Sequence, residues 1–135
     1  MNETAERILR QYRTIAVVGL STNPDKSAHS VPAAMQAAGF RVIPVHPSAE
    51  SILGERAYRS LAEVPEPVEV VEVFRPSPEA ADVARAAVEI GAKALWLQQG
   101  IASAEARTIA EEAGLDYVED ICMAVVRSIA QIKKD

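Results

Sequence analysis

The sequence of 135 residues is poor in the residues that build disulfides and metal sites. Its single cysteine, Cys122, excludes a disulfide framework within the chain. Its two histidines, His29 and His46, lie near neither a cysteine nor each other, whereas metal ligands usually occur at short spacings. The sequence therefore predicts neither a disulfide nor a metal site.

Positive charge and long apolar runs are also scarce. The formal net charge is −5, whereas a protein that binds duplex nucleic acid normally presents a basic face. No apolar run approaches the roughly 20 residues that span a bilayer. Residues 1–6 are polar and acidic, unlike the basic and then apolar order of a signal peptide. We therefore expect a cytoplasmic protein that binds neither nucleic acid nor membrane.

The rest of the composition is that of a globular protein, with 49% hydrophobic and 24% charged residues. The length fits one domain, residues 1–135. Short apolar runs alternate with segments of helical period, without an internal repeat or a linker. Parallel strands joined by right-handed crossovers follow from this alternation. The sequence thus predicts a three-layer, doubly wound α/β domain with a mainly parallel five-stranded sheet and helices on both faces.

The bounds of the expected elements follow from the apolar pattern and from the residues that stop it. Strands are expected at 14–18, 41–45, 68–73, 94–97 and 116–118, with a short edge strand near 57–58. Helices are expected at 4–12, 77–90, 103–113 and 121–132. A further helix should begin between residues 27 and 30 and end at residue 38. Ser77, Ser103 and Asp120 are expected to cap the last three helices. Pro44 has no N–H group, so it should occupy either the frayed end of its strand or an unpaired position.

One stretch organises the chain, the turn that begins at Gly19. A buried strand stops at this glycine, and hydroxyl, amide and ammonium groups follow from Ser21, Thr22, Asn23, Lys26 and Ser27. A tight turn into a helix directs backbone N–H groups and the positive end of the helix dipole toward one point. The stretch is therefore predicted to bind an anion such as a pyrophosphate or a phosphorylated ribose.

Two common nucleotide motifs are absent. The G-x-G-x-x-G motif fails because no glycine follows Gly19 before Gly39, and no Walker sequence occurs. The second strand ends in His46-Pro47 instead of the acidic residue that would hold a nicotinamide ribose. A nicotinamide site is therefore disfavoured. The prolines and valines around the turn are predicted to form a flat apolar slot for an adenine ring.

Three further residues near the expected carboxyl ends of the strands leave alternatives open. Arg75 either neutralises a ligand phosphate or pairs with Glu72 or Glu79. His46 either contacts ligand or only lines the crevice. Cys122 is either a reactive thiol or, as is more frequent, a small apolar residue between helix and sheet.

Several blocks of the sequence together resemble a known family. They are Val17–Ser21 with Asn23-Pro24, Gly39–Pro47, Ile52–Gly54, Phe74-Arg75 and Leu95–Ile101. In this order they resemble the small stand-alone coenzyme A-binding proteins, which are similar to the N-terminal, Rossmann-like domain of the succinyl-CoA synthetase α subunit. The resemblance extends from about residue 14 to residue 122.

The resemblance implies that the ligand is coenzyme A or an acyl-CoA. It implies that the first turn and Lys26 hold the phosphates, that 44–47 and 74–75 line the nucleotide cleft, and that 99–101 lie near the pantetheine arm. The predicted binding residues are Gly19, Ser21, Thr22, Asn23, Lys26, Ser27, Pro44, Val45, His46, Pro47, Phe74, Arg75, Gln99, Gly100 and Ile101.

The resemblance also implies binding without catalysis. The synthetase needs a second domain with a histidine that becomes phosphorylated and an ATP-grasp partner, and we expect neither here. We expect no catalytic residues, and a monomer or small homo-oligomer. Two alternatives stay open: a CoA-linked or nucleotide-linked enzyme that uses His46 or Cys122, and an interaction module with a vestigial cleft.

Overall fold

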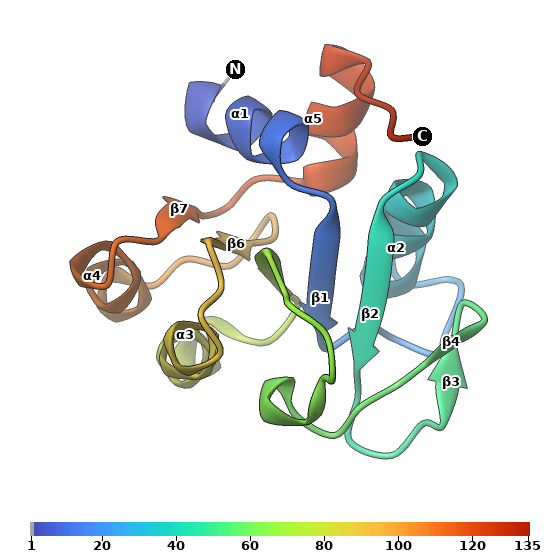
Figure 1. The fold of residues 1–135 in the computed structure, drawn as a ribbon, viewed down its shortest axis with the longest axis horizontal. Coiled ribbons are helices and arrows are strands. Elements are labelled where there is room, and N and C mark those ends of the chain that lie inside the picture. Colours follow the sequence, from blue (N-terminus) through green and yellow to red (C-terminus); the bar gives the residue numbers. More distant parts are fainter. Residues whose placement is uncertain (1) are drawn as a thin grey trace.

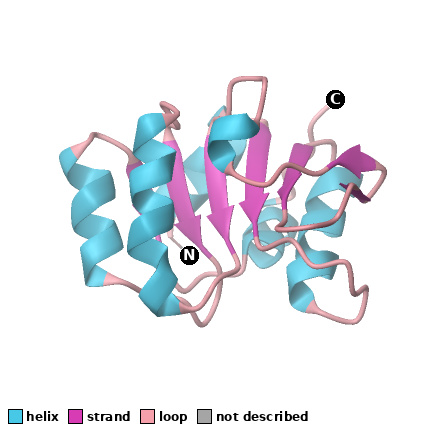
Figure 2. Cartoon of the chain, turned by 90° about the horizontal axis from the view of Figure 1, so that it is seen from below, coloured by secondary structure: helices cyan, strands magenta, loops and turns pink. Residues whose placement is uncertain are grey.

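The structure is a computed structural model that describes residues 2–135, and its centre is one parallel sheet (Figures 1 and 2). The strands are β1 (Thr14–Val18), β2 (Arg41–Val45), β5 (Val70–Val73), β6 (Ala94–Leu97) and β7 (Asp116–Val118), in the order β2-β1-β5-β6-β7. Every neighbouring pair is parallel. The predicted α/β fold class is confirmed, and β5 begins two residues later than expected.

Helices cover both faces of this sheet (Figure 1). One face packs against α1 (Glu3–Gln11), α2 (Ser27–Ala37) and α5 (Met123–Ala130), and the other against α3 (Ala80–Glu89) and α4 (Ala104–Glu112). Successive strand residues point to opposite faces, so Leu95 belongs to the α3/α4 core while Trp96 is buried in the other core. No helix among residues 2–135 is long and apolar enough to cross a membrane.

The strand order reverses between β1 and β5. The chain first moves from β1 to β2 on one side, then returns to place β5 on the other side of β1. The connections leave the carboxyl ends of β1 and β5 in opposite directions, so a crevice opens between them. This crevice is where doubly wound sheets bind their ligands.

Pro44 lies in the interior of β2, on the outer side of an edge strand. The Val45 carbonyl accepts a hydrogen bond from Gly19 N on the β1 side, whereas the Pro44 carbonyl accepts from Tyr58 N on the opposite side. The missing N–H group therefore costs no bond to β1, as predicted. The expected edge strand reduces to one bridge between Val45 and Tyr58, preceded by the hairpin of β3 (Ser51–Ile52) and β4 (Glu55–Arg56).

Of the three predicted caps, only Ser103 is confirmed; its hydroxyl accepts from Ala106 N at 3.0 Å. Ser77 instead begins a 3-10 turn, η2 (Ser77–Glu79), and its hydroxyl accepts from Ala102 N at 3.1 Å. Asp120 accepts from Gly100 N at 2.7 Å, while the buried Gln98 side chain accepts from Met123 N at the start of α5. Both predictions were wrong because each side chain bonds to the backbone of a loop distant in sequence instead of to its own helix.

Glu72 carries a carboxyl group into the core between the sheet and α1, α2 and α5. Its neighbours in register are Val17 and Trp96, and both belong to that core. Glu72 has no exposed surface, and neither of its carboxyl oxygens has a hydrogen-bond partner among residues 2–135. Burial raises the pKa of Glu72 from 4.5 to about 8, so the carboxyl group is mostly protonated at neutral pH in the folded protein.

Replacing Glu72 should make the protein more stable in alkaline solution. In the unfolded chain this carboxyl ionises above about pH 4.5, whereas in the folded chain it ionises only near pH 8. Its contribution to stability is therefore complete below pH 4.5 and is lost as the pH rises through about 8. We expect Glu72→Met to raise the free energy of unfolding by roughly 2–4 kcal/mol near pH 8 and by less near pH 5.

Urea unfolding of both proteins at the two pH values measures this difference. Glu89→Met, at an exposed position of α3, is the matched control and should leave the pH dependence of the wild type unchanged. Equal pH dependence for Glu72→Met and the wild type would contradict a protonated Glu72.

Candidate functional site

A cavity of about 370 Å³ opens at the reversal point of the sheet, a volume typical of small-molecule sites. Its walls come from the segments after β1, β2 and β5, from the loop after β4, and from η2 and α3. The lining residues are Val18, Gly19, Val45, His46, Pro47, Arg59, Arg75, Glu79, Asp82 and Val83. The structure thus brings together five of the predicted binding residues, which are Gly19, Val45, His46, Pro47 and Arg75.

Gly19 allows the chain to turn at the rim of this cavity. Its φ is +90°, and a β-carbon there would lie 2.9 Å from the carbonyl oxygen of Phe74 and 3.0 Å from Cδ of Arg75. Its own N–H donates to the Val45 carbonyl at 3.1 Å. The turn therefore fits against β2 and against the segment after β5 only because position 19 has no side chain.

The segment from Ser21 to Lys26 is held by its own polar groups. The Ser21 hydroxyl accepts from Asn23 N, and the Asn23 side chain accepts from Asp25 N, both at 3.0 Å. His29 is half-buried, with its Nδ1 2.7 Å from the Ser21 carbonyl oxygen. Lys26 is exposed and precedes α2, and its carbonyl accepts from His29 N at 2.9 Å and from Ser30 N at 3.0 Å. The N–H groups before these two are the ones that a helix start leaves without an intrahelical acceptor. Ser27, the first residue of α2, does not cap it.

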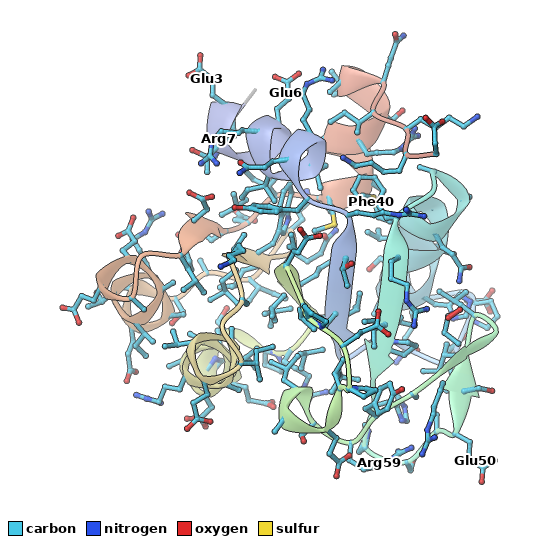
Figure 3. All side chains as sticks on the ribbon, in the orientation of Figure 1. Glu3, Glu6, Arg7, Phe40, Glu50 and Arg59 are labelled. Atoms are coloured by element: carbon cyan, nitrogen blue, oxygen red, sulfur yellow. The ribbon has the colours of Figure 1, made fainter. Side chains whose placement is uncertain are left out.

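Arg59 is the one cationic lining residue that the sequence did not predict; Val18, Glu79, Asp82 and Val83 also line the cavity and were not among the predicted binding residues. Its guanidinium donates to the His46 carbonyl at 2.8 Å and to the Ala49 carbonyl, so it fixes the loop after β2. It forms no ion pair with a carboxylate of residues 2–135. Figure 3 shows Arg59 beyond the end of β2, at the carboxyl edge of the sheet. Arg59 directly follows the short edge strand expected near 57–58, where no motif or regular apolar pattern indicated a binding residue.

His46 is oriented by the same loop. Its Nδ1 accepts hydrogen bonds from Ser48 N at 3.1 Å and from Ala49 N at 2.9 Å. An accepting Nδ1 places the proton of the neutral ring on Nε2. His46 is thus arranged to donate one hydrogen bond from Nε2, and its Nδ1 is not free to act as a base.

Arg75 pairs with Glu79, which decides between the two partners considered for it. The guanidinium meets the carboxylate with two bonds, from Nε at 3.1 Å and from Nη2 at 3.0 Å. The Glu79 carboxylate raises the pKa of Arg75. Both side chains are about half exposed, at 47% and 50%, and both line the cavity.

The other predicted residues lie outside the cavity lining. They are Ser21, Thr22, Asn23, Lys26, Ser27, Pro44, Phe74, Gln99, Gly100 and Ile101. Phe74 packs against the core on the α2/α5 face. Gly100 N donates a hydrogen bond to the Asp120 carboxylate, which holds the loop of residues 99–101 in place. Cys122 is half-buried against that same core and does not line the cavity, which favours its packing role.

Comparison with known proteins identifies the family. A sequence model described as "CoA binding domain" matches residues 13–128. The chain belongs to this CoA-binding domain family. The expected resemblance is therefore confirmed over most of the chain.

Relatives of this CoA-binding domain agree in size and shape. The uncharacterized protein YneT of Bacillus subtilis is 39% identical over 126 residues, which cover 93% of each chain. A hypothetical protein from Pyrococcus horikoshii has a structure with a TM-score of 0.92 at 33% identity, over 97% of this chain and 92% of that one.

A larger enzyme contains the same fold. The dinucleotide-forming acetyl-coenzyme A synthetase 1 of Ca. Korarchaeum cryptofilum gives a TM-score of 0.71 at 22% identity. The match covers 84% of this chain but 28% of the synthetase. The likeness shows that the CoA-binding domain has the fold of one part of that enzyme.

A methyl group at position 19 should disturb both the fold and the cavity. We expect Gly19→Ala to lower the free energy of unfolding by about 1–3 kcal/mol, because the positive φ and the nearby Phe74 carbonyl oxygen both oppose a β-carbon. Gly54→Ala is the control, since its φ is also positive but a β-carbon there would meet no atom within 4 Å. Thermal unfolding of both variants measures the difference, and an equal loss would contradict a crowded Gly19 turn.

Proposed function

We propose that the protein binds coenzyme A or an acyl-CoA at the reversal point of the sheet, with the adenosine end in the cavity beside Gly19. The observation that carries this proposal is that five of the residues implicated by the family resemblance line a single cavity there. Phosphates would lie between this cavity and the N-terminus of α2, held by the turn 19–27 and by Lys26. The pantetheine arm would extend toward residues 99–101.

The chemistry of the cavity suits an adenosine with phosphates attached. Val18, Val45 and Val83 supply apolar surface for a base. Next to it lies a second, apolar hollow of about 220 Å³ that includes Leu61 and Ala86 and shares these valines. Arg59 supplies a positive charge that has no carboxylate partner within residues 2–135, and arginine is well matched to phosphate oxygens.

We propose binding without catalysis by this chain. The Nδ1 of His46 accepts two backbone hydrogen bonds, and Cys122 lies outside the cavity, so neither residue favours the enzymatic alternative. A cytoplasmic location and a monomer or small homo-oligomer remain predictions.

Isothermal titration calorimetry tests the ligand directly. We expect CoA and acetyl-CoA to bind with similar affinity and more tightly than NAD or ATP. The absence of heat with both CoA species would overturn the proposal. Tighter binding of NAD than of CoA would also overturn it and would indicate a nicotinamide nucleotide as the ligand.

Two cation substitutions test the placement of the phosphates. Arg59→Ala should weaken CoA binding by about 10- to 100-fold and Lys26→Ala by about 3- to 10-fold, because each removes a charged hydrogen-bond donor. Lys93→Ala, at an exposed position away from the cavity, is the control and should change affinity by less than about twofold.

Melting temperatures separate binding from folding in these variants. Lys26→Ala should melt like the wild type, because Lys26 is exposed and its side chain caps nothing. A clear drop in melting temperature alongside the loss of affinity would assign Lys26 a structural role instead.

A further inference from the structure

We propose that Glu79 occupies the place of a ligand phosphate on Arg75 in the free protein, so that binding exchanges this carboxylate for a phosphate. The inference rests on the proposed function, because it assumes a phosphate-bearing ligand in this cavity. It identifies Glu79 as a residue that sets affinity and selects for ligands whose phosphate displaces it.

The contacts place the exchange at one guanidinium edge. Glu79 occupies Nε and Nη2 of Arg75 with its two carboxylate oxygens, at 3.1 and 3.0 Å. A phosphate prefers the same two-bond geometry on arginine. The two anions therefore compete for one edge and cannot both use it.

The position of Arg75 makes this competition relevant to binding. Its Cδ would lie only 3.0 Å from a β-carbon at position 19, so the side chain extends over the turn predicted to hold phosphate. Glu79 and Arg75 also both line the cavity. The paired edge thus lies beside the proposed phosphate path.

The exchange is energetically accessible. Both members are about half exposed, and exposed pairs of this kind contribute little to stability. Glu79 ends the short 3-10 turn η2 just before α3, and its carboxylate forms no other hydrogen bond among residues 2–135. It can therefore turn toward solvent when a phosphate takes Arg75.

The plain alternative is a surface ion pair of no functional meaning. Arg107 and Glu111 form such a pair at the same spacing of four residues, at 3.6 Å and outside the cavity. Glu111→Gln therefore removes the same charge with the same chemistry as Glu79→Gln, and it serves as the matched control.

Calorimetric titration with CoA and with adenosine 3′,5′-bisphosphate, the nucleotide part of CoA, tests the exchange. We expect Glu79→Gln to tighten binding of both by about 3- to 10-fold, because an anion near the phosphate is removed and Arg75 is freed. Glu111→Gln should change affinity by less than about twofold. Unchanged or weaker binding by Glu79→Gln would overturn the proposal while leaving CoA binding intact, whereas a wild type that binds neither probe would overturn the proposed function itself.

A second comparison separates exchange from general repulsion. In an Arg75→Gln background there is no guanidinium to exchange, so adding Glu79→Gln should give less than about twofold further gain. A gain as large as in the wild-type background would show that Glu79 acts by repulsion alone and would overturn the exchange.

Discussion

The contact on which the site depends is the close approach of three chain segments at Gly19. The backbone of this residue lies against the Val45 carbonyl on one side and against the Phe74 carbonyl and Arg75 side chain on the other. These are the ends of β1, β2 and β5, so the contact joins the strands on both sides of the reversal point. A larger residue would separate them, and the cavity walls would no longer meet.

Charge in the cavity is arranged by the same three segments. Arg59 bonds to backbone carbonyls of the loop after β2, so its charge is not cancelled. The charge of Arg75, after β5, is balanced by Glu79. The two arginines of this cavity therefore differ in how readily they can bind an anion, although both carry the same charge.

The fold was predictable from sequence because it depends on local pattern. Apolar runs located the five strands of the parallel sheet to within two residues, and the Gly19 turn followed from the strand that ends there. The small hairpin of β3 and β4 was not predicted. Ser77, Asp120 and Arg59 were misassigned or missed because their hydrogen bonds cross between loops 10 to 25 residues apart. Glu72 had no visible signal either, since only the finished sheet shows which face its side chain takes.

The bridge between Val45 and Tyr58 has a consequence for self-association. An open strand edge offers unpaired backbone groups to other chains, and such edges promote aggregation. Here the Tyr58 N–H group already donates a hydrogen bond to the Pro44 carbonyl, and the proline itself has no N–H group to offer. The β2 edge is therefore closed to strand addition at its carboxyl end, so a second molecule cannot extend the sheet beside the cavity.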